Sequence, residues 1–410
     1  MKNQGWKRFL SSPGKIAVAI AGVFFVLALV ERFTGATDIT SSGASGATLR
    51  FAIPILLAGL GGLWSERAGV INIGLEGMMI VGTWMGAWFG FLYGPWTGLL
   101  FAAIGGALTG LLHAILTVKI GIDQAVSGLA INLLAAGATR YFSGIYFVAN
   151  GGDISVSPLV QQPGTFSVPG VSEFLGGIEG HDTFFVSSVA GVLGGLVTNV
   201  SWMTLLALLC VPLTWWILWK TGFGLRVRFS GENPVAAESL GVNVYRVRYI
   251  AISISGMLAA LGGAYLSLVA SAVYREGQTG GRGFIGLATV IFGNWRPGGV
   301  FSGSLLFGFT DALRVRQAES VHAVLAVVAI VALLFAIYLF AVRRRKGAVV
   351  SAVIGLIAGI VFLQVKVIPD EFVTFFPNLV TLLVLVFMAR RLRPPAMAGA
   401  KYRKGEEISE

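Results

Sequence analysis

The chain has 410 residues, of which 55% are hydrophobic and 12% are charged, against about 25% charged residues in an ordinary soluble domain. This contrast excludes a soluble globular protein. The net charge of +11 does not come from one clustered basic surface, so nucleic acid is not expected as a partner. The single cysteine, Cys210, excludes a disulfide framework and a cysteine-rich metal site. The lipid bilayer is the expected surrounding.

Apolar runs of membrane length follow one another along the chain, since a hydrocarbon core about 30 Å thick requires about 20 apolar residues in a helix. They lie at residues 16–30, 49–64, 70–92, 97–118, 125–148, 203–219, 249–270, 284–293, 299–313, 322–342, 348–368 and 373–389. Segment 284–293 is too short to cross comfortably. The sequence therefore predicts an all-α fold, a polytopic membrane helix bundle in which residues 1–410 form a single transmembrane domain.

Basic residues indicate the direction of these spans, because Lys and Arg in short loops stay on the cytoplasmic side. With residues 1–15 inside and every segment crossing, most of the 30 Lys and Arg residues fall in the cytoplasm. Those that remain outside are Arg32, Arg50, Arg140, Arg275, Arg282, Arg314, Arg316 and Lys366. The opposite orientation would invert the ratio, so both termini, including the tail 390–410, are predicted to be cytoplasmic.

Turn-forming residues interrupt two apolar segments, at 61–72 (GGLWSERAGVIN) and 292–300 (FGNWRPGGV). Interrupted helices often line a transport route, because freed backbone groups must face a cavity or protein rather than lipid. Asn72 and Glu76 are one helical turn apart and would point the same way on a continuous helix. Together with Asn132 on the fifth span, they are candidates for lining or gating a substrate route. The alternative is a structural hydrogen bond between helices.

Glycine recurs at every fourth position on the third span. Gly82, Gly86, Gly90 and Gly94 align in one row along a helix, which lets another backbone approach closely. We expect this row to serve helix packing rather than to bind a ligand directly.

The longest outer segment is the predicted loop 149–202, which is rich in Gly, Pro, Ser and Val and contains a weak apolar run at 184–197. Two interpretations are open. The run is either a re-entrant piece or lid at the outer mouth, or an interfacial helix in a surface loop.

The main cytoplasmic loop, residues 220–248, contains the pattern of a short capped helix. Asn233 is a favourable N-cap, and Pro234 suits the first helical position, where its missing N–H costs nothing. Gly241 is placed to end the helix in a left-handed conformation. About two turns of helix are not stable alone in water, so this element needs a partner surface.

Ala236, Ala237 and Leu240 give the short helix a narrow apolar face, with arginines on both sides of it in the sequence. This arrangement favours insertion into a groove on another protein. An ordinary loop between helices with a capped turn is the alternative.

The string GENPVAAESLGVNVYRVR in this loop resembles the coupling loop of the permease subunits of bacterial ATP-binding-cassette importers, in the branch that serves branched-chain amino acids, ribose and nucleosides. AIPILLAGLGGLWSERAGVINIGLEGMM at 52–79 and GGRGFIGLATVIFGNWRPGGVFSGSLLFGFTDALR at 280–314 are similar to the nucleoside or simple-sugar permeases of that branch. The likeness covers residues 49–314 and the last helix, 373–404.

This resemblance implies a permease of the bacterial inner membrane that moves nucleosides, or a related simple sugar, by alternating access. It implies a dimer, usually with a sister permease, cytoplasmic ATP-binding subunits that receive the coupling helices, and an extracytoplasmic binding protein that delivers the substrate. The positions that match the coupling motif are Glu232, Asn233, Pro234, Ala236, Ala237 and Gly241.

The sequence departs from the family pattern after Asp311, where region 318–368 contributes two additional spans around Arg343–Lys346. The bundle is therefore expected to contain about ten core transmembrane helices plus this extra pair. As a pair, the two spans preserve the topology downstream.

The motif inventory gives little support to an enzyme. The chain contains no GxxxxGK[ST] phosphate loop, and none of its three histidines begins an HExxH zinc motif. No cofactor or metal is expected in this chain, and ATP would be used by a partner. The rival function is an ion-coupled secondary transporter of a small polar solute. It predicts uptake by this chain alone and an ion site among intramembrane carboxylates, of which Glu76 is nearly the only deep one.

Overall fold

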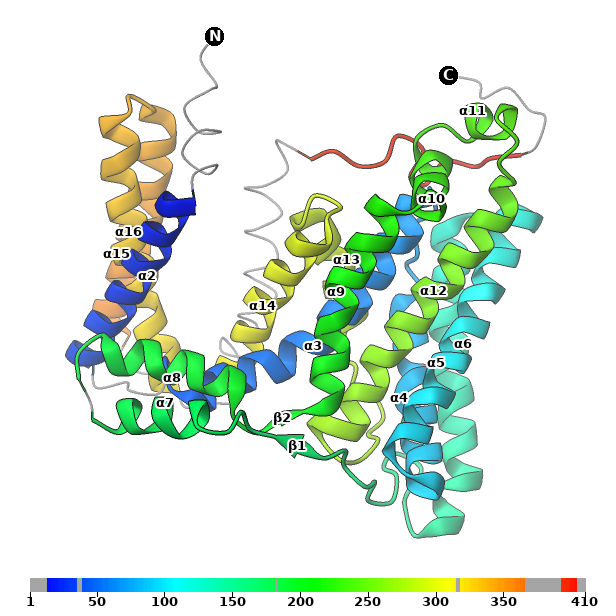
Figure 1. The fold of residues 1–410 in the computed structure, drawn as a ribbon, viewed down its shortest axis with the longest axis horizontal. Helices are drawn as coiled ribbons and strands as arrows, with labels where there is room; N and C mark the ends of the chain where they lie inside the picture. Colours follow the sequence, from blue (N-terminus) through cyan, green and yellow to red (C-terminus); the bar gives the residue numbers. More distant parts are fainter. Residues whose placement is uncertain (1–12, 35–38, 182, 315–317, 366–391, 404–410) are drawn as a thin grey trace. The chain divides into compact units, whose positions relative to one another are not determined.

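The computed structural model describes residues 13–34, 39–181, 183–314, 318–365 and 392–403. This part of the chain is almost entirely helical (Figure 1), and seven of its helices are long and apolar enough to cross a membrane. The predicted all-α, polytopic membrane fold is confirmed. The predicted span 373–389 lies outside the described residues.

The helices are α2 (Pro13–Thr34), α3 (Ser42–Arg67), α4 (Leu75–Tyr93), α5 (Pro95–Ala114), η1 (Ile115–Ile120), α6 (Gln124–Tyr146), η2 (Val148–Asn150), α7 (Val171–Gly180), α8 (Val186–Val197), α9 (Trp202–Lys220), α10 (Gly222–Glu232), α11 (Pro234–Ser239), α12 (Val244–Tyr265), η3 (Leu266–Ala270), α13 (Arg282–Phe292), α14 (Pro297–Arg314), α15 (Ala318–Ala341) and α16 (Arg345–Gln364). Two short strands, β1 (Thr165–Phe166) and β2 (Val200–Ser201), pair antiparallel. The π-helices η1 and η3 continue α5 and α12, so these two spans reach Ile120 and Ala270.

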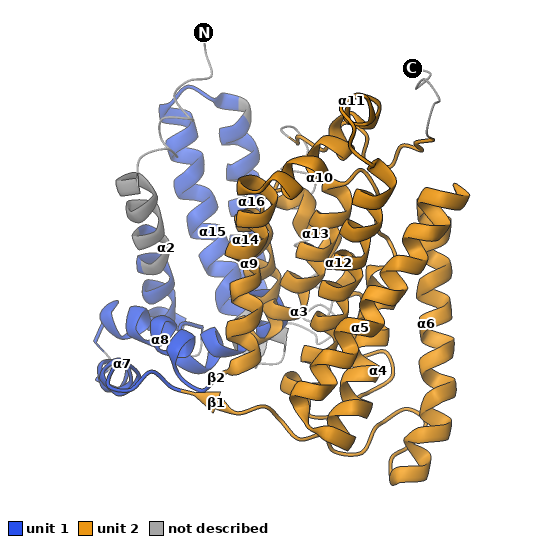
Figure 2. Ribbon diagram, turned by 45° about the vertical axis from the view of Figure 1, so that its right-hand side comes forward, with its two compact units in different colours: residues 1–48, 167–199, 309–377 blue, residues 49–166, 200–308, 378–410 orange. Residues whose placement is uncertain are grey.

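The chain divides into two compact units (Figure 2). Unit 1 contains residues 1–48, 167–199 and 309–377, and unit 2 contains residues 49–166, 200–308 and 378–410. The residues predicted to line the substrate route and to form the coupling contact all belong to unit 2.

The centre of unit 2 is built from α4, α5 and α12, which pack closely because glycines remove side chains from their contacts. A Cβ on Gly82 would lie 2.0 Å from the carbonyl oxygen of Ala260 on α12, and one on Gly86 would lie 2.9 Å from Cβ of Ala264. Gly90 of the same row faces the Leu268 side chain of η3. Most of the predicted glycine row therefore lies against the seventh predicted span.

Gly94 differs from the other members of this row. A Cβ there would meet nothing within 4 Å, and its φ of +91° ends α4 immediately before Pro95 begins α5. Gly94 keeps the four-residue spacing of the row, but helix α4 ends before it. Gly94 therefore forms the turn between α4 and α5 rather than a contact between helices.

In unit 1, helices α15 and α16 form an antiparallel hairpin that packs with α2. The outer loop predicted at 149–202 contains two short helices of this unit, α7 and α8. Helix α8 forms at the predicted apolar run. With 12 residues, it extends about 18 Å, which is too short to cross a hydrocarbon core of about 30 Å.

Candidate functional site

A break in regular structure separates α3 from α4 and lies inside unit 2. Helix α3 ends at Arg67 and α4 begins at Leu75, and between them Gly69 turns the chain with a φ of +92°. Asn72 in the middle of this stretch has no exposed surface, and Val70 has 1%. Backbone groups freed from a helix at such a buried place must find partners within the protein.

Side chains of α5 and α6 supply those partners. The Ile71 N–H donates to Oε1 of Gln124 (2.7 Å), and Nε2 of His113 lies 3.4 Å from the Ile71 carbonyl oxygen. Asn132 bridges two points: its Nδ2 donates to the Ile73 carbonyl (3.1 Å), and its Oδ1 accepts from the Gly77 N–H (2.7 Å). Asn132 and Gln124 therefore fix the break to α6.

Asn72 does not share a helix face with Glu76, contrary to the prediction. Asn72 precedes the first residue of α4, so the one-turn spacing has no helical geometry to act on. Its Nδ2 instead donates to Ser255 Oγ of α12 (3.0 Å) and approaches the Met78 sulfur (3.3 Å). Within the described part of the chain, Oδ1 of Asn72 is buried and has no hydrogen-bond partner.

Glu76 binds the first turn of α13. Its Oε1 accepts from the Gly281 N–H (2.9 Å) and its Oε2 accepts from the Gly283 N–H (2.7 Å). A carboxylate at this end of a helix satisfies free N–H groups and complements the helix dipole. A Cβ on Gly283 would lie 2.5 Å from the Glu76 backbone nitrogen, so glycine permits the close approach.

The other end of α13 is held by the end of α3. Trp295, just beyond α13, donates its indole N–H to the Glu66 carboxylate, and its carbonyl accepts from Arg67 Nη2 (2.6 Å). Helix α13 has 11 residues and extends about 16 Å, about half of a hydrocarbon core. It is a short helix fixed at both ends by the α3–α4 region.

Arg282, which the charge argument counted on the outer side, is buried at the start of this helix. Arg282 is the first residue of α13, is 8% exposed, and donates to the Gln278 and Thr279 carbonyls (3.1 and 3.3 Å). Because α13 begins inside the protein beside Glu76, its first residue is buried with it.

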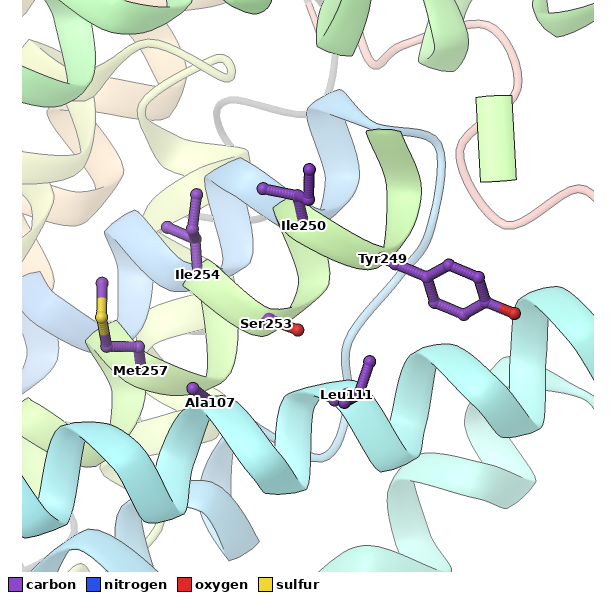
Figure 3. A pocket seen from close by; sticks show the side chains of 7 residues that line it. All are labelled: Ala107, Leu111, Tyr249, Ile250, Ser253, Ile254 and Met257. Atoms are coloured by element: carbon purple, nitrogen blue, oxygen red, sulfur yellow. The ribbon is translucent and has the colours of Figure 1, made fainter. Parts of the chain in front are cut away.

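A separate groove of about 270 Å³ lies between α5 and α12 (Figure 3). Its walls are formed by side chains such as Leu111, Ile254 and Met257, with polar atoms only from Tyr249 and Ser253. It lacks the several hydrogen-bonding side chains that would bind a sugar or another polar solute. The groove is therefore a poor candidate for a solute site.

The short helix predicted in loop 220–248 is confirmed. Helix α11 begins at Pro234, and Oδ1 of Asn233 accepts from the Ala236 N–H (3.0 Å). Gly241 has a φ of +80°, as the left-handed ending requires. The last residue of α11 is Ser239, two residues before Gly241.

The predicted apolar face of α11 is divided between two sides. Ala237 is fully buried, whereas Leu240 is 75% exposed and Val235 is 36% exposed. Pro234 is also buried. The motif residues therefore build and seat the helix, and Val235 and Leu240 form its exposed apolar side.

Helix α10, immediately before α11, was not predicted. Thr221 caps it, with its hydroxyl accepting from the Gly224 N–H (3.1 Å), and Gly224 lies against the Ile217 carbonyl of α9. Its glycines and low hydrophobicity hid it, and the threonine cap was the one available signal. At the end of α10, Oε1 of Glu232 lies 3.8 Å from Nη1 of Arg67, whose guanidinium also donates to the Trp295 carbonyl.

Residues 46–338 match the protein family described as "Branched-chain amino acid transport system / permease component". The chain belongs to this family of transport permeases. It is a multi-pass membrane permease subunit, as the helices predict. Of the two spans expected to be additional, 322–342 lies within the match as far as residue 338, whereas 348–368 lies beyond it.

Curated relatives of the permease include subunits with several named substrates. The guanosine ABC transporter permease protein NupQ of Bacillus subtilis is 34% identical over 278 residues, which are 66% of this chain and 81% of the relative. The putative glucose ABC transporter permease protein TsgC13 of Haloferax volcanii is 36% identical over 286 residues, 68% of this chain and 78% of the relative. The nucleoside ABC transporter permease protein NupC of Lactococcus lactis is 32% identical over 282 residues, 65% and 80% of the two chains. No solved structure gives a significant match to the permease.

Proposed function

We propose that this permease is the membrane-spanning subunit of an ATP-driven importer of nucleosides, or of a related simple sugar, and that it works by alternating access. The relatives named for guanosine and for nucleosides support the first substrate class, and the relative named for glucose supports the second. Separate cytoplasmic subunits hydrolyse ATP, and this chain is not itself an enzyme.

The observation that carries this proposal is helix α11. It is capped by Asn233, seated through Ala237, and presents Leu240 with 75% of its surface exposed. A six-residue helix with an exposed leucine at its end suits a groove on a partner protein. The proposed partner is the ATP-binding subunit, and Glu232, Asn233, Pro234, Ala236, Ala237 and Gly241 are the residues proposed to build the contact.

The proposed substrate route passes the break between α3 and α4. Asn72 lies in this break, Asn132 binds the backbone on both sides of it, and Glu76 just beyond it holds the start of α13, so a helix end and irregular backbone lie close together. Glu76 and Asn132 have partners in the chain and are proposed to shape the route, whereas Oδ1 of Asn72, buried and without a partner in this structure, is proposed to accept from a solute hydroxyl when the route opens.

The proposed setting is the bacterial inner membrane, with both termini in the cytoplasm. A sister permease or a second copy of this chain completes the channel, and an extracytoplasmic binding protein delivers the substrate. These partners follow the importer architecture that the relatives' names indicate.

Reconstitution into vesicles tests the proposal. The permease with its ATP-binding subunits and sister permease is expected to take up labelled guanosine only when ATP and the binding protein are present, and unlabelled nucleosides compete better than glucose. Uptake by this chain alone, driven by an ion gradient, would show the rival secondary transporter. Competition by glucose but not by nucleosides would assign the sugar as substrate.

A further inference from the structure

The C-terminal segment 392–403 lies along the loop that carries α10 and α11 (Figure 1). It has no regular secondary structure and is bound through its backbone. The Met397 N–H donates to the Gly231 carbonyl (2.9 Å) and the Ala396 N–H donates to Oε2 of Glu232 (3.2 Å). These bonds attach the segment to the end of α10, directly before α11 begins.

Tyr402 attaches the same segment to α11 itself. Its ring packs in a cluster with Ala237 and Val244, and its hydroxyl donates to the Glu238 carboxylate. The guanidinium of Arg248 lies 5.3 Å from the centre of the ring, which is a favourable cation–π contact. Tyr402 is only 6% exposed and packs against the buried Ala237 of α11, whereas Leu240 is 75% exposed.

The segment also reaches the break between α3 and α4. The Gly399 N–H donates to the Gly69 carbonyl (3.3 Å). A Cβ on Gly399 would lie 3.0 Å from Cδ1 of Ile71, and the φ of +85° at Gly399 favours glycine there. Segment 392–403 therefore binds both α11 and the first residues of the proposed substrate route.

We infer that segment 392–403 is a strap that fixes the orientation of α11 relative to the break, and that Tyr402 is its positioning residue. A helix of six residues has no stable orientation of its own. The strap supplies the support on the inner side of α11, so that force applied to Leu240 moves the break rather than the helix alone. This inference rests on the proposed function, in which a separate ATP-binding subunit engages α11.

The test uses the full complex in vesicles with four variants. Tyr402→Phe keeps the ring and removes the hydrogen bond to Glu238. Tyr402→Ala removes both. Lys401→Ala changes an exposed neighbour in the strap, and Tyr141→Phe removes the hydroxyl of a tyrosine that is 67% exposed on α6. The last two are controls.

The expected result is a loss of coupling. Tyr402→Phe lowers the substrate transported per ATP hydrolysed by about fivefold, the size expected for one lost hydrogen bond. In Tyr402→Phe, KM for the substrate, yield and thermal stability stay close to wild type. Tyr402→Ala lowers the coupling further and also lowers thermal stability, because it removes a buried ring. Both controls match the wild type. Two further variants complete the test, Glu238→Ala and its combination with Tyr402→Phe. The combination is expected to show no further loss beyond the more severe single change, because the two residues act through one contact.

Unchanged coupling in both Tyr402 variants would overturn the strap. So would a loss confined to thermal stability or to KM, because Tyr402 would then support the fold or the substrate site. Uptake measured with the wild-type chain distinguishes failure of the strap proposal from failure of the proposed function. If the wild-type chain takes up substrate without ATP-binding subunits, the importer proposal itself is wrong.

Discussion

At the scale of single residues, the Glu76 carboxylate binds the backbone of a second helix, α13. Its two oxygens accept from the N–H groups of Gly281 and Gly283 at the start of α13, where the helix itself offers no partner for them. Placing this carboxylate away from water is costly unless such bonds compensate it. We therefore expect the position of α13 to depend on Glu76.

Replacement of Glu76 by Gln is expected to lower both stability and uptake. Glutamine keeps one carbonyl acceptor and brings an NH₂ group opposite the second backbone N–H, so the free energy of unfolding should fall by about 1–3 kcal/mol. Thermal unfolding in detergent and uptake in vesicles measure the two effects. Glu173→Gln, at an exposed position on α7, is the control and should change neither. Wild-type stability and uptake in Glu76→Gln would contradict this role.

At the scale of the elements, the central packing of unit 2 depends on backbone contacts that tolerate no side chain. Gly82 of α4 lies against the backbone of Ala260 on α12, and Gly263 of α12 lies against the Met79 carbonyl of α4. Contacts of this kind supply the association between membrane helices, where burial of apolar surface from water contributes little.

Gly82→Ala is therefore expected to destabilise unit 2. The new methyl group would lie 2.0 Å from a backbone oxygen that can move only with its helix, so overpacking should cost about 1–3 kcal/mol. Gly137→Ala provides the matched control, because Gly137 lies inside α6 and a Cβ there meets nothing within 4 Å. Alanine at 137 should be neutral or stabilising by about 0.5–1 kcal/mol. Thermal unfolding of both variants decides, and equal effects would refute the packing argument.

Elements whose signals lie within a few residues of one another could be predicted from the sequence. Elements that are held by hydrogen bonds to backbone groups far away in the sequence could not. Helix α11 was found because its asparagine cap, first-turn proline and terminal glycine each act within a few residues. The turn-forming residues at 61–72 indicated the break between α3 and α4, but the apolar run at 70–92 placed the start of the next span before Leu75, because a buried irregular stretch and a buried helix are equally apolar. The partners of Glu76 are backbone N–H groups, which leave no side-chain pattern, and the strap 392–403 is bound in the same way.

At the scale of the whole molecule, the contacts within unit 2 agree with the side of the membrane that the count of Lys and Arg residues predicts for each loop. Residues predicted to be cytoplasmic contact one another. Arg67 contacts Glu232 and Trp295, and the Arg393 N–H donates to Oδ1 of Asn294. Positions predicted to be outside also meet, since Arg140 pairs with Glu276 (2.6 Å) and residue 156 bridges residue 275. Among the residues that the structure describes, no hydrogen bond or ion pair joins the two groups, which supports opposite faces of the membrane.

Because the chain has a single cysteine, labelling of single-cysteine variants can test how the protein is oriented in the membrane. Cys210→Ala removes the only thiol of the chain, and one new cysteine is then placed at Lys401 in the strap or at Glu173 on α7, both exposed. With cytoplasmic termini, a membrane-impermeant maleimide applied to intact cells should label the Glu173→Cys protein and leave the Lys401→Cys protein unlabelled until the cells are opened. Labelling of Lys401→Cys in intact cells would place α11 outside, where no ATP-binding subunit could reach it, and would exclude ATP-driven import through this helix.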